Sequence, residues 1–250
     1  MIEVVDHGPI RELRLNRPPA NALDHDLVRT LDIAVHEAPA AGVQALILSG
    51  QPGMFCAGLD VHALLQRDET GMSEFFRAFF HLLRSLAEST IPLVAAMAGH
   101  APAGGTVMAA FCDRRILAEG NYKMGFTEHQ VGLPVPRPVL RAFEQICGPR
   151  VAHDYGLRGA VMNGEEALRI GLVDELAPAD QVLQIALDWC RQLLALPNRD
   201  ALAATRRYAR QSMIQAFAHL DQDVEEFTAL WCSDRTQATL KTLVARLRAT

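Results

Sequence analysis

Two glycine-marked turns and one isolated carboxylate are the parts of this sequence best suited to chemistry. The pair Gly104-Gly105 opens a segment that runs to Cys112 without a charged residue, which predicts a buried helix. The first amides of such a helix have no partner within it and lie at the positive end of its dipole. They could stabilise a small anionic or polarised oxygen, although a turn used only for packing would show the same glycines.

The second glycine-marked turn, Gly53 to Asp60, also follows a compact apolar run, Ala45 to Leu48. Glu128 is the isolated carboxylate, at the start of a proline-rich segment that runs from Thr127 to Pro138. A carboxylate acts as a general base when it is held within reach of the proton that it removes. The alternative for Glu128 is a solvated turn residue.

The elements that must hold these residues begin with short strands. Ile2 to Val5 and Ile10 to Asn16 predict a hairpin. Ile91 to Met97 and Arg114 to Leu117 predict further strands, and a short one is expected within Asn121 to Phe126.

Helices are expected between these strands. Asp24 can cap a helix whose apolar face is Leu27, Leu31, Ala34, Val35 and Ala38. Residues 61–72 are polar, and we expect a mobile loop there. A further helix is expected from Ser73, with a stripe made of Phe75, Phe76, Phe79, Phe80, Leu83 and Leu86. Such a stripe is typical of core packing, and its alternative role is the wall of a ligand pocket.

The later part of the chain changes character. Helices are expected over Val139 to Cys147 and Val151 to Leu157, Asn163 to Glu166 resembles a capping box, and Gly171 to Leu176 predicts a strand. From Asp180 onward the pattern predicts about four helices and nothing else. Because strands and helices alternate up to about Leu176, we expect βαβ crossovers, a sheet covered by helices and an α/β fold class.

Length and composition exclude several classes of protein. A chain of 250 residues, 50% apolar and 21% charged, fits a packed globular core. Its net charge of −5 provides no general attraction to nucleic acid or to an anionic membrane. The five cysteines form no C-x-x-C, which argues against a disulfide framework or a zinc site and for a reducing compartment. With no signal-like start and no apolar run of about 18 residues, we expect a cytoplasmic protein without a membrane partner.

Sequence motifs of other enzyme classes are missing. The chain contains no G-x-S-x-G, P-loop, HExxH or Rossmann G-x-G-x-x-G pattern. We therefore do not expect a serine hydrolase, a nucleotidase, a metalloenzyme or a dehydrogenase.

Taken together, the two glycine-marked turns resemble the paired oxyanion-hole motifs of the crotonase (enoyl-CoA hydratase/isomerase) superfamily. These motifs are Phe55-Cys-Ala-Gly-Leu-Asp60 and Gly99-His-Ala-Pro-Ala-Gly-Gly105. Within the superfamily the chain is most similar to the Δ3,Δ2-enoyl-CoA isomerases of mitochondrial type. That similarity rests on Ala57-Gly-Leu-Asp60, Pro102-Ala-Gly-Gly105, Cys112-Asp-Arg, Arg115-Ile-Leu-Ala118 and Glu128-x-Gln-Val-Gly132 followed by Pro136. It implies a crotonase-like spiral of ββα units over residues 1–195 and a helical trimerisation region over residues 196–250.

The resemblance also implies roles for individual residues. The backbone amides of Leu59 and Gly104 would form an oxyanion hole for the enolate oxygen of a thioester, each donor contributing ~3–4 kcal/mol in the transition state. CoA would arrive as part of the substrate, with no other cofactor and no metal. The residues implied in substrate and CoA binding are Ala20, Ala22, Ala57, Gly58, Asp60, Val61 and Thr127.

The number of carboxylates distinguishes two reactions within the superfamily. Its hydratases use two glutamates, one on the buried helix and one on the later segment. Val107 occupies the helix position here, and Glu128 matches the second position. Adding water needs two acids, whereas moving a double bond needs one base that takes a proton from C2 and returns it at C4. We therefore expect an enoyl-CoA isomerase in which Glu128, its pKa raised by desolvation, carries the proton.

Several alternatives stay open at this point. One is an enoyl-CoA hydratase or another crotonase-type acyl-CoA enzyme, and another is a non-catalytic acyl-CoA-binding subunit. The resemblance implies a homotrimer or a dimer of trimers.

Weaker candidates for a functional role include three histidines. We expect His129 to point to solvent, His100 to be satisfied behind its turn and His62 to border the CoA loop. A basic run, Arg206, Arg207 and Arg210, could meet a CoA phosphate, although a charged helix face is usually solvated.

Overall fold

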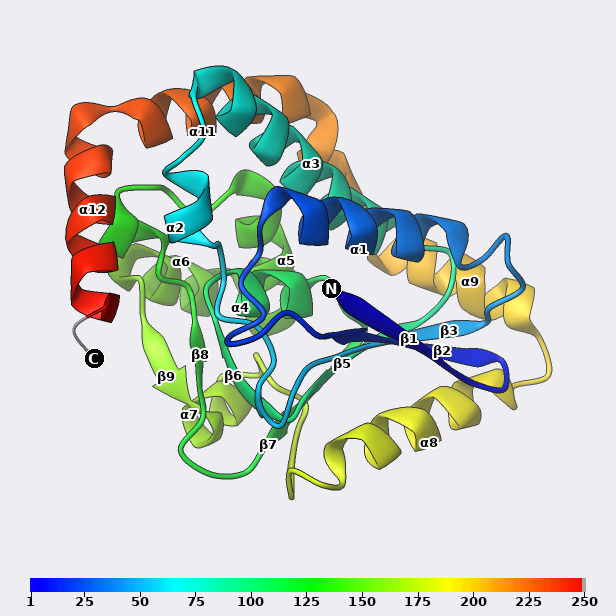
Figure 1. Ribbon diagram of the computed structural model, residues 1–250. Helices are drawn as coiled ribbons and strands as arrows, with labels where there is room; N and C mark the ends of the chain where they lie inside the picture. Colours follow the sequence, from blue (N-terminus) through cyan, green and yellow to red (C-terminus); the bar gives the residue numbers. More distant parts are fainter. Residues whose placement is uncertain (249–250) are drawn as a thin grey trace.

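Two sheets wound together with helices make up the computed structural model of the protein, which describes residues 1–248 (Figure 1). In the larger sheet, β1 (Ile2–His7) and β2 (Ile10–Leu15) form the expected antiparallel hairpin. The sheet continues in parallel through β3 (Ala45–Ser49), β5 (Leu93–Met97), β7 (Arg114–Ala118) and β10 (Glu175–Ala177). Its strand order is β1-β2-β3-β5-β7-β10.

The smaller sheet receives one strand from each turn of the chain. It contains β4 (Gly53–Met54), β6 (Gly99–Pro102) and β8 (Lys123–Gly125) in parallel, with β9 (Val161–Asn163) antiparallel at one edge. Along the chain, β3, β5 and β7 are followed by β4, β6 and β8 of the smaller sheet, respectively, and each of these is followed by a helical segment. This repetition is the spiral of ββα units implied by the resemblance, so the predicted α/β fold class is confirmed.

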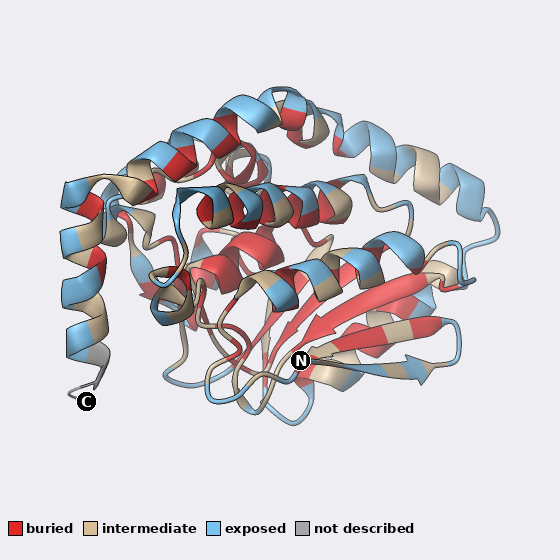
Figure 2. Cartoon of the chain, turned by 45° about the horizontal axis from the view of Figure 1, so that its top comes forward, coloured by how far each residue is buried: buried red, intermediate tan, exposed pale blue. Residues whose placement is uncertain are grey.

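Helices cover both faces of the larger sheet. Alternate side chains of β3 face opposite sides, since Leu46 and Leu48 join the core that includes α1 (His25–Glu37) and α3 (Glu69–Glu88). Ala45 and Ile47 instead pack with α8 (Val182–Leu194). Figure 2 shows the inner strands of the sheet as buried, whereas the outer hairpin strand and the outward surfaces of the helices are largely exposed. The helix predicted from the glycine pair is α4 (Gly104–Ala110), which is buried at every residue.

The polar stretch from residue 61 to 72 is not a loop, so that expectation was wrong. Its first residues form α2 (Val61–Leu64), and α3 already begins at Glu69 rather than at Ser73. Both starts are capped by aspartate: Asp60 accepts from the amide of Ala63 at 2.9 Å, and Asp68 accepts from Gly71 at 2.8 Å. Side-chain capping satisfied the first amides of each helix, which outweighed the polarity of the segment.

The strand expected over Gly171 to Leu176 is shorter than predicted. Gly171 adopts a left-handed φ of +82°, and the carboxylate of Asp174 accepts the amide of Arg115, so only β10 pairs in the sheet. Asn163 caps α7 (Gly164–Arg169) as expected. The side chain of Glu166 does not complete the capping box, because it bonds to Tyr155 instead.

The segment after β8 begins with a 3-10 turn, η1 (Glu128–Val131), and continues in α5 (Arg137–Cys147) and α6 (Pro149–Arg158). The C-terminal helices are α9 (Arg199–Ala209), α10 (Gln211–Gln215), a 3-10 turn over Ala216–His219, α11 (Leu220–Cys232) and α12 (Asp234–Arg248). Of these, α11 packs on α3, and α12 reaches both η1 and α2. Within residues 1–248, no helix is both long and apolar enough to cross a membrane.

Candidate active site

The loop that carries Leu59 is fixed by backbone hydrogen bonds to the loop before α1. The amide of Leu23 donates to the carbonyl of Gly58 at 2.7 Å, and the amide of Asp60 donates to the carbonyl of Leu23 at 2.9 Å. Because successive amides of an extended chain point in opposite directions, the Leu59 amide between them faces away from this loop. It has no acceptor among the described residues and belongs to a residue that lines a cavity of about 620 Å³.

Gly104 brings a second unpaired amide to the same cavity. As the first residue of α4 it has no acceptor one turn earlier, and the described chain gives it none elsewhere. The preceding Ala103 holds a left-handed φ of +48°, a conformation that costs a residue with a Cβ on the order of 1–3 kcal/mol.

Glycine is required where the two loops meet. A Cβ added to Gly58, whose φ is +93°, would lie 2.6 Å from the Cβ of Ala103. A Cβ added to Gly104 would lie 2.8 Å from Leu23 Cδ1 and 3.1 Å from the Cα of Gly58. The glycines therefore allow the two turns to touch, which brings the amides of Leu59 and Gly104 to one wall of the cavity. Gly58 itself stands behind that wall and does not line the cavity.

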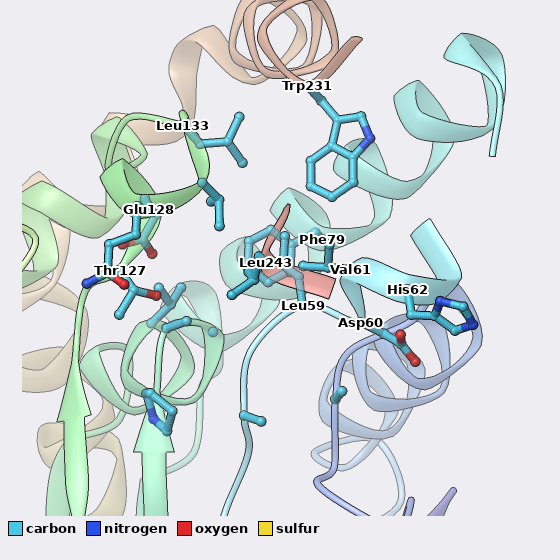
Figure 3. Close-up of a pocket in the computed structure, with 18 of the residues that line it drawn as sticks. Leu59, Asp60, Val61, His62, Phe79, Thr127, Glu128, Leu133, Trp231 and Leu243 are labelled. Atoms are coloured by element: carbon cyan, nitrogen blue, oxygen red, sulfur yellow. The ribbon is translucent and has the colours of Figure 1, made fainter. Parts of the chain in front are cut away.

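The Glu128 side chain is directed into this cavity, as Figure 3 shows. One of its carboxyl oxygens, Oε2, is buried and has no hydrogen-bond partner among the described residues. Burial raises the pKa of Glu128 to about 7, although the nearby amides of Glu128 and Thr127 act in the opposite direction. The carboxyl group is therefore available as a base near neutral pH, because no salt bridge or strong hydrogen bond holds its charge.

Asp60, the other acidic residue among the described residues that line the cavity, is already engaged. Its Oδ1 caps α2, and its Oδ2 lies 2.7 Å from Arg17 Nη2. The same guanidinium reaches Asp24 at 2.9 Å and donates to the carbonyl of Ala22 at 3.0 Å. Arg17 thus ties together the two loops that the resemblance assigns to CoA, and it leaves Glu128 as the unpaired acid of the cavity.

The remaining candidates are distributed around one cavity. Its lining includes Ala20, Ala22, Ala57, Asp60, Val61 and Thr127 from the binding residues expected, together with Leu59, Gly104 and Glu128. Val107, at the position where a second acid was sought, also lines it and is 2% exposed. The cavity is therefore apolar at the position where a hydratase of this superfamily would have its second acid.

The sequence did not identify the far wall of the cavity. Phe227 and Trp231 of α11 and Leu243 and Val244 of α12 line it, and Trp231 stands above the labelled residues in Figure 3. The apolar stripe of α3 has both of the roles considered for it. Phe76 and Phe79 form part of the cavity wall, whereas the other members of the stripe pack only in the core. Helical periodicity marks these side chains as apolar but contains no signal for which of them meet empty space.

The histidines lie as expected. His129 is exposed, His62 lines the cavity beside Val61, and His100 accepts the amide of Lys123 at 3.1 Å.

The basic run divides, because Arg207 is exposed as a solvated helix face predicts, whereas Arg206 and Arg210 are not. The side chains of Arg206 and Arg210 are buried against Asp113 instead of facing solvent or a phosphate. Arg206 Nε lies 2.8 Å from Asp113 Oδ2, and Arg210 Nη1 lies 2.8 Å from Asp113 Oδ1. Arg210 also donates to the carbonyls of Leu86 and Ala87, so this cluster fixes α9 and α10 to the core. Residues 1–248 contain no group of three or more His, Cys, Asp or Glu side chains arranged to hold a metal.

Comparison with known proteins shows the family of this chain. The sequence profile of the enoyl-CoA hydratase/isomerase family matches residues 7–249. The chain belongs to the enoyl-CoA hydratase/isomerase family. Members of this crotonase superfamily with similar sequences include human mitochondrial enoyl-CoA delta isomerase 1, which is 31% identical over 94% of this chain and 79% of the human protein.

The chain is also similar to a solved structure of this family, and its relatives include proteins named as isomerases and as hydratases. The crystal structure of human mitochondrial Δ3-Δ2-enoyl-CoA isomerase has a TM-score of 0.94 at 30% identity, covering 99% of this chain and 98% of the human chain. A "probable enoyl-CoA hydratase" of Mycobacterium avium is 33% identical over 78% of this chain and 75% of that protein. The chain is therefore an enzyme with the α/β crotonase fold, and its acyl-CoA chemistry is that of the enoyl-CoA hydratase/isomerase family.

Proposed function

We propose that the enzyme moves the double bond of 3-enoyl-CoA to give trans-2-enoyl-CoA. One observation supports the proposal most strongly: among the described residues that line the cavity, Glu128 provides the one unpaired carboxyl group. The position where a hydratase would have its second acid holds an apolar residue, Val107. One base is sufficient to move a proton between two carbons of the same substrate, whereas hydration also requires a water molecule to be oriented and a second proton to be delivered.

In the proposed reaction the ionised carboxyl of Glu128 removes a proton from C2 of the substrate. The electrons of the broken C2–H bond spread over the conjugated system and place negative charge on the thioester oxygen. Glu128 then returns the proton to C4, which forms the C4–H bond, leaves the double bond between C2 and C3, and regenerates the carboxylate. A base with a pKa of about 7 suits both halves of this transfer near neutral pH.

The developing charge on the thioester oxygen would be stabilised by the amides of Leu59 and Gly104. Both amides lack acceptors in the described chain, both residues line the cavity, and peptide groups held by packed glycine turns need little reorganisation. Neither a metal nor a redox cofactor enters this scheme, because CoA is part of the substrate.

The loops joined by Arg17 would bind CoA. These loops contribute part of the cavity lining, namely Ala20, Ala22, Ala57, Asp60 and Val61. Thr127, which also lines the cavity, directly precedes the proposed base in sequence. The acyl chain would extend toward Phe227 and Trp231. We also propose that residues 1–195 form a spiral core and that the protein is located in the cytoplasm. Residues 196–250 would mediate self-association into a homotrimer or a dimer of trimers, which light scattering of the purified chain tests.

The decisive experiment follows 3-enoyl-CoA turnover in the wild type, in Glu128→Gln and in a control, Glu165→Gln. Glu165 is an exposed glutamate in the first turn of α7, so its replacement should leave turnover unchanged. Glu128→Gln should lose at least about 10³-fold in kcat while binding a saturated acyl-CoA within about threefold of the wild type. Retained turnover in Glu128→Gln removes this residue from its role.

Hydration is the second candidate, favoured by the hydratase named among the relatives. Incubation of crotonyl-CoA in deuterium oxide distinguishes it, because a hydratase would give a 3-hydroxyacyl product. The wild type should form little of this product, and Val107→Glu should form more, since it adds a second acid to the cavity. Rapid hydration by the wild type would overturn the isomerase proposal. A non-catalytic binding subunit would show no turnover of either substrate.

A further inference from the structure

Thr106 occupies a position between the two halves of the proposed catalytic machinery. It lies in the first turn of α4, is 0% exposed, and precedes Val107, which lines the cavity. Its hydroxyl donates to the carbonyl of Ala101 at 2.6 Å and accepts from the amide of Gly125 at 2.7 Å. One side chain on the buried helix therefore joins β6 to β8.

The strand β8 is the part of the chain that leads to Glu128. Gly125 pairs in register with Pro102, so the groups of the β6 segment that face it belong to the residues on either side of Pro102, Ala101 and Ala103. In a parallel ladder of this register the Gly125 amide is directed toward the carbonyl of Ala101. The Thr106 hydroxyl contacts both of these groups, so the spacing of the strands at this rung depends on a side chain as well as on the backbone.

Gly125 is also held through its carbonyl, which accepts the amide of Ala103 at 2.8 Å. Ala103 directly precedes Gly104, and Gly125 is three residues before Glu128. A Cβ at Gly125 would lie 2.1 Å from the carbonyl oxygen of Ala160, so only glycine lets β8 approach the start of β9 this closely. The two hydrogen bonds at Gly125 consequently connect the segment bearing the oxyanion-hole amide to the segment bearing the base.

We propose that Thr106 is a positioning residue whose hydroxyl sets the placement of the Glu128 carboxyl relative to the Gly104 amide. This inference rests on the proposed function, because it assigns those two groups to one reaction. Removing the hydroxyl takes away a second partner from both the Gly125 amide and the Ala101 carbonyl and leaves this rung to the backbone ladder alone. A displacement on the order of 1 Å at a reacting centre is enough to cost about 100-fold in rate.

The test compares Thr106→Val, which keeps the shape but lacks the hydroxyl, with Thr106→Ser, which keeps the hydroxyl. We expect kcat of Thr106→Val to fall by about 10- to 100-fold, with KM and the affinity for a saturated acyl-CoA within about threefold of the wild type. Thr106→Ser should keep at least about a third of the wild-type kcat. Rates are normalised to bound acyl-CoA, so a loss of folded protein does not count as a loss of rate.

Thr228→Val is the matched control for the loss of a buried hydroxyl. Thr228 is buried on α11, and its hydroxyl donates only to the carbonyl of Val224 within the same helix, at 2.7 Å. Its replacement should leave kcat unchanged. If Thr106→Val does not fold, Thr106→Ala and Thr106→Ser provide the same comparison, since they also differ in the hydroxyl.

A second readout, deuterium exchange at C2 of a saturated acyl-CoA, distinguishes a failure of the Thr106 role from a failure of the proposed isomerase function. This exchange requires only the base and the oxyanion hole, and it should follow kcat across the variants. Full kcat and exchange in Thr106→Val, or equal losses in Thr106→Val and Thr106→Ser, would overturn the positioning role. Exchange without isomerisation in the wild type would overturn the proposed function alone, and the exchange rates would then decide the role of Thr106. Neither activity in the wild type would overturn both.

Discussion

Replacing Glu128 with glutamine should change the pH dependence of stability as well as remove turnover. Burial raises the pKa of this carboxyl from 4.5 to about 7, so the folded chain keeps its proton in a range where the unfolded chain has released it. The proton therefore stabilises the folded state most strongly below pH 4.5, and this contribution is lost as pH rises through about 7. Integrating the two titrations from pH 5 to pH 8 gives a loss of about 2.5 kcal/mol in the free energy of unfolding.

Denaturant unfolding at pH 5, 6, 7 and 8 measures this quantity in the wild type, Glu128→Gln and the Glu165→Gln control. The difference between the wild type and Glu128→Gln should change by about 2.5 kcal/mol across the range, in favour of the glutamine variant at high pH. The control should follow the wild type throughout. Parallel pH profiles for all three proteins would refute the reasoning, because Glu128 would then ionise as an exposed glutamate does.

The same pKa fixes the shape of the activity profile. With a pKa of about 7, about 1% of the carboxyl is ionised at pH 5, so kcat/KM should be about 100-fold below its plateau there. Steady-state kinetics across this range should show one acidic limb with a slope of one. A plateau that continues below pH 6 would contradict a buried base.

Three other substitutions test the walls of the cavity. Gly58→Ala should lower kcat by about 100-fold in steady-state assays, because the new Cβ displaces an oxyanion-hole donor; a change of less than twofold would argue against this contact. Trp231→Leu should favour longer acyl chains, by about fourfold in kcat/KM for each methylene newly buried, and an unchanged chain-length profile would contradict that wall. Arg17→Met should raise KM for acyl-CoA several-fold with kcat little changed, since Asp24 and Asp60 lose their shared cation; a selective loss of kcat would place Arg17 elsewhere in the reaction.

The sequence carried information about those parts of the site that depend on local chain geometry. Gly58 and Gly104 were visible because no side chain fits where their turns touch, and α4 was visible because a helix without polar residues must be buried. Asp24 capped α1 as expected, since capping involves residues three apart in the chain. Glu128 was identified from its match to a family motif, and only the structure gives its buried, unpaired oxygen.

Other features depend on contacts between distant segments. Trp231 reaches the cavity from more than 100 residues beyond Glu128, and its helix has no local mark that distinguishes a cavity wall from core. Arg206 and Arg210 resembled a solvated basic face because Asp113, which neutralises them, lies far away in sequence. The caps at Asp60 and Asp68 are local, but the polar composition of residues 61–72 is equally typical of a loop.

The donors at Leu59 and Gly104 are peptide groups, which has a consequence for how such a catalyst can diversify. Among substitutions only proline removes a peptide N–H, so other side-chain changes leave both proposed donors in place as long as the glycine clearances persist. The proposed base, Glu128, is instead a side chain that one substitution removes, and so is Val107 at the other candidate acid position. If these roles hold, a new reaction on the same scaffold requires few amino-acid changes, because the backbone donors persist while the side chains at positions 107 and 128 are exchanged.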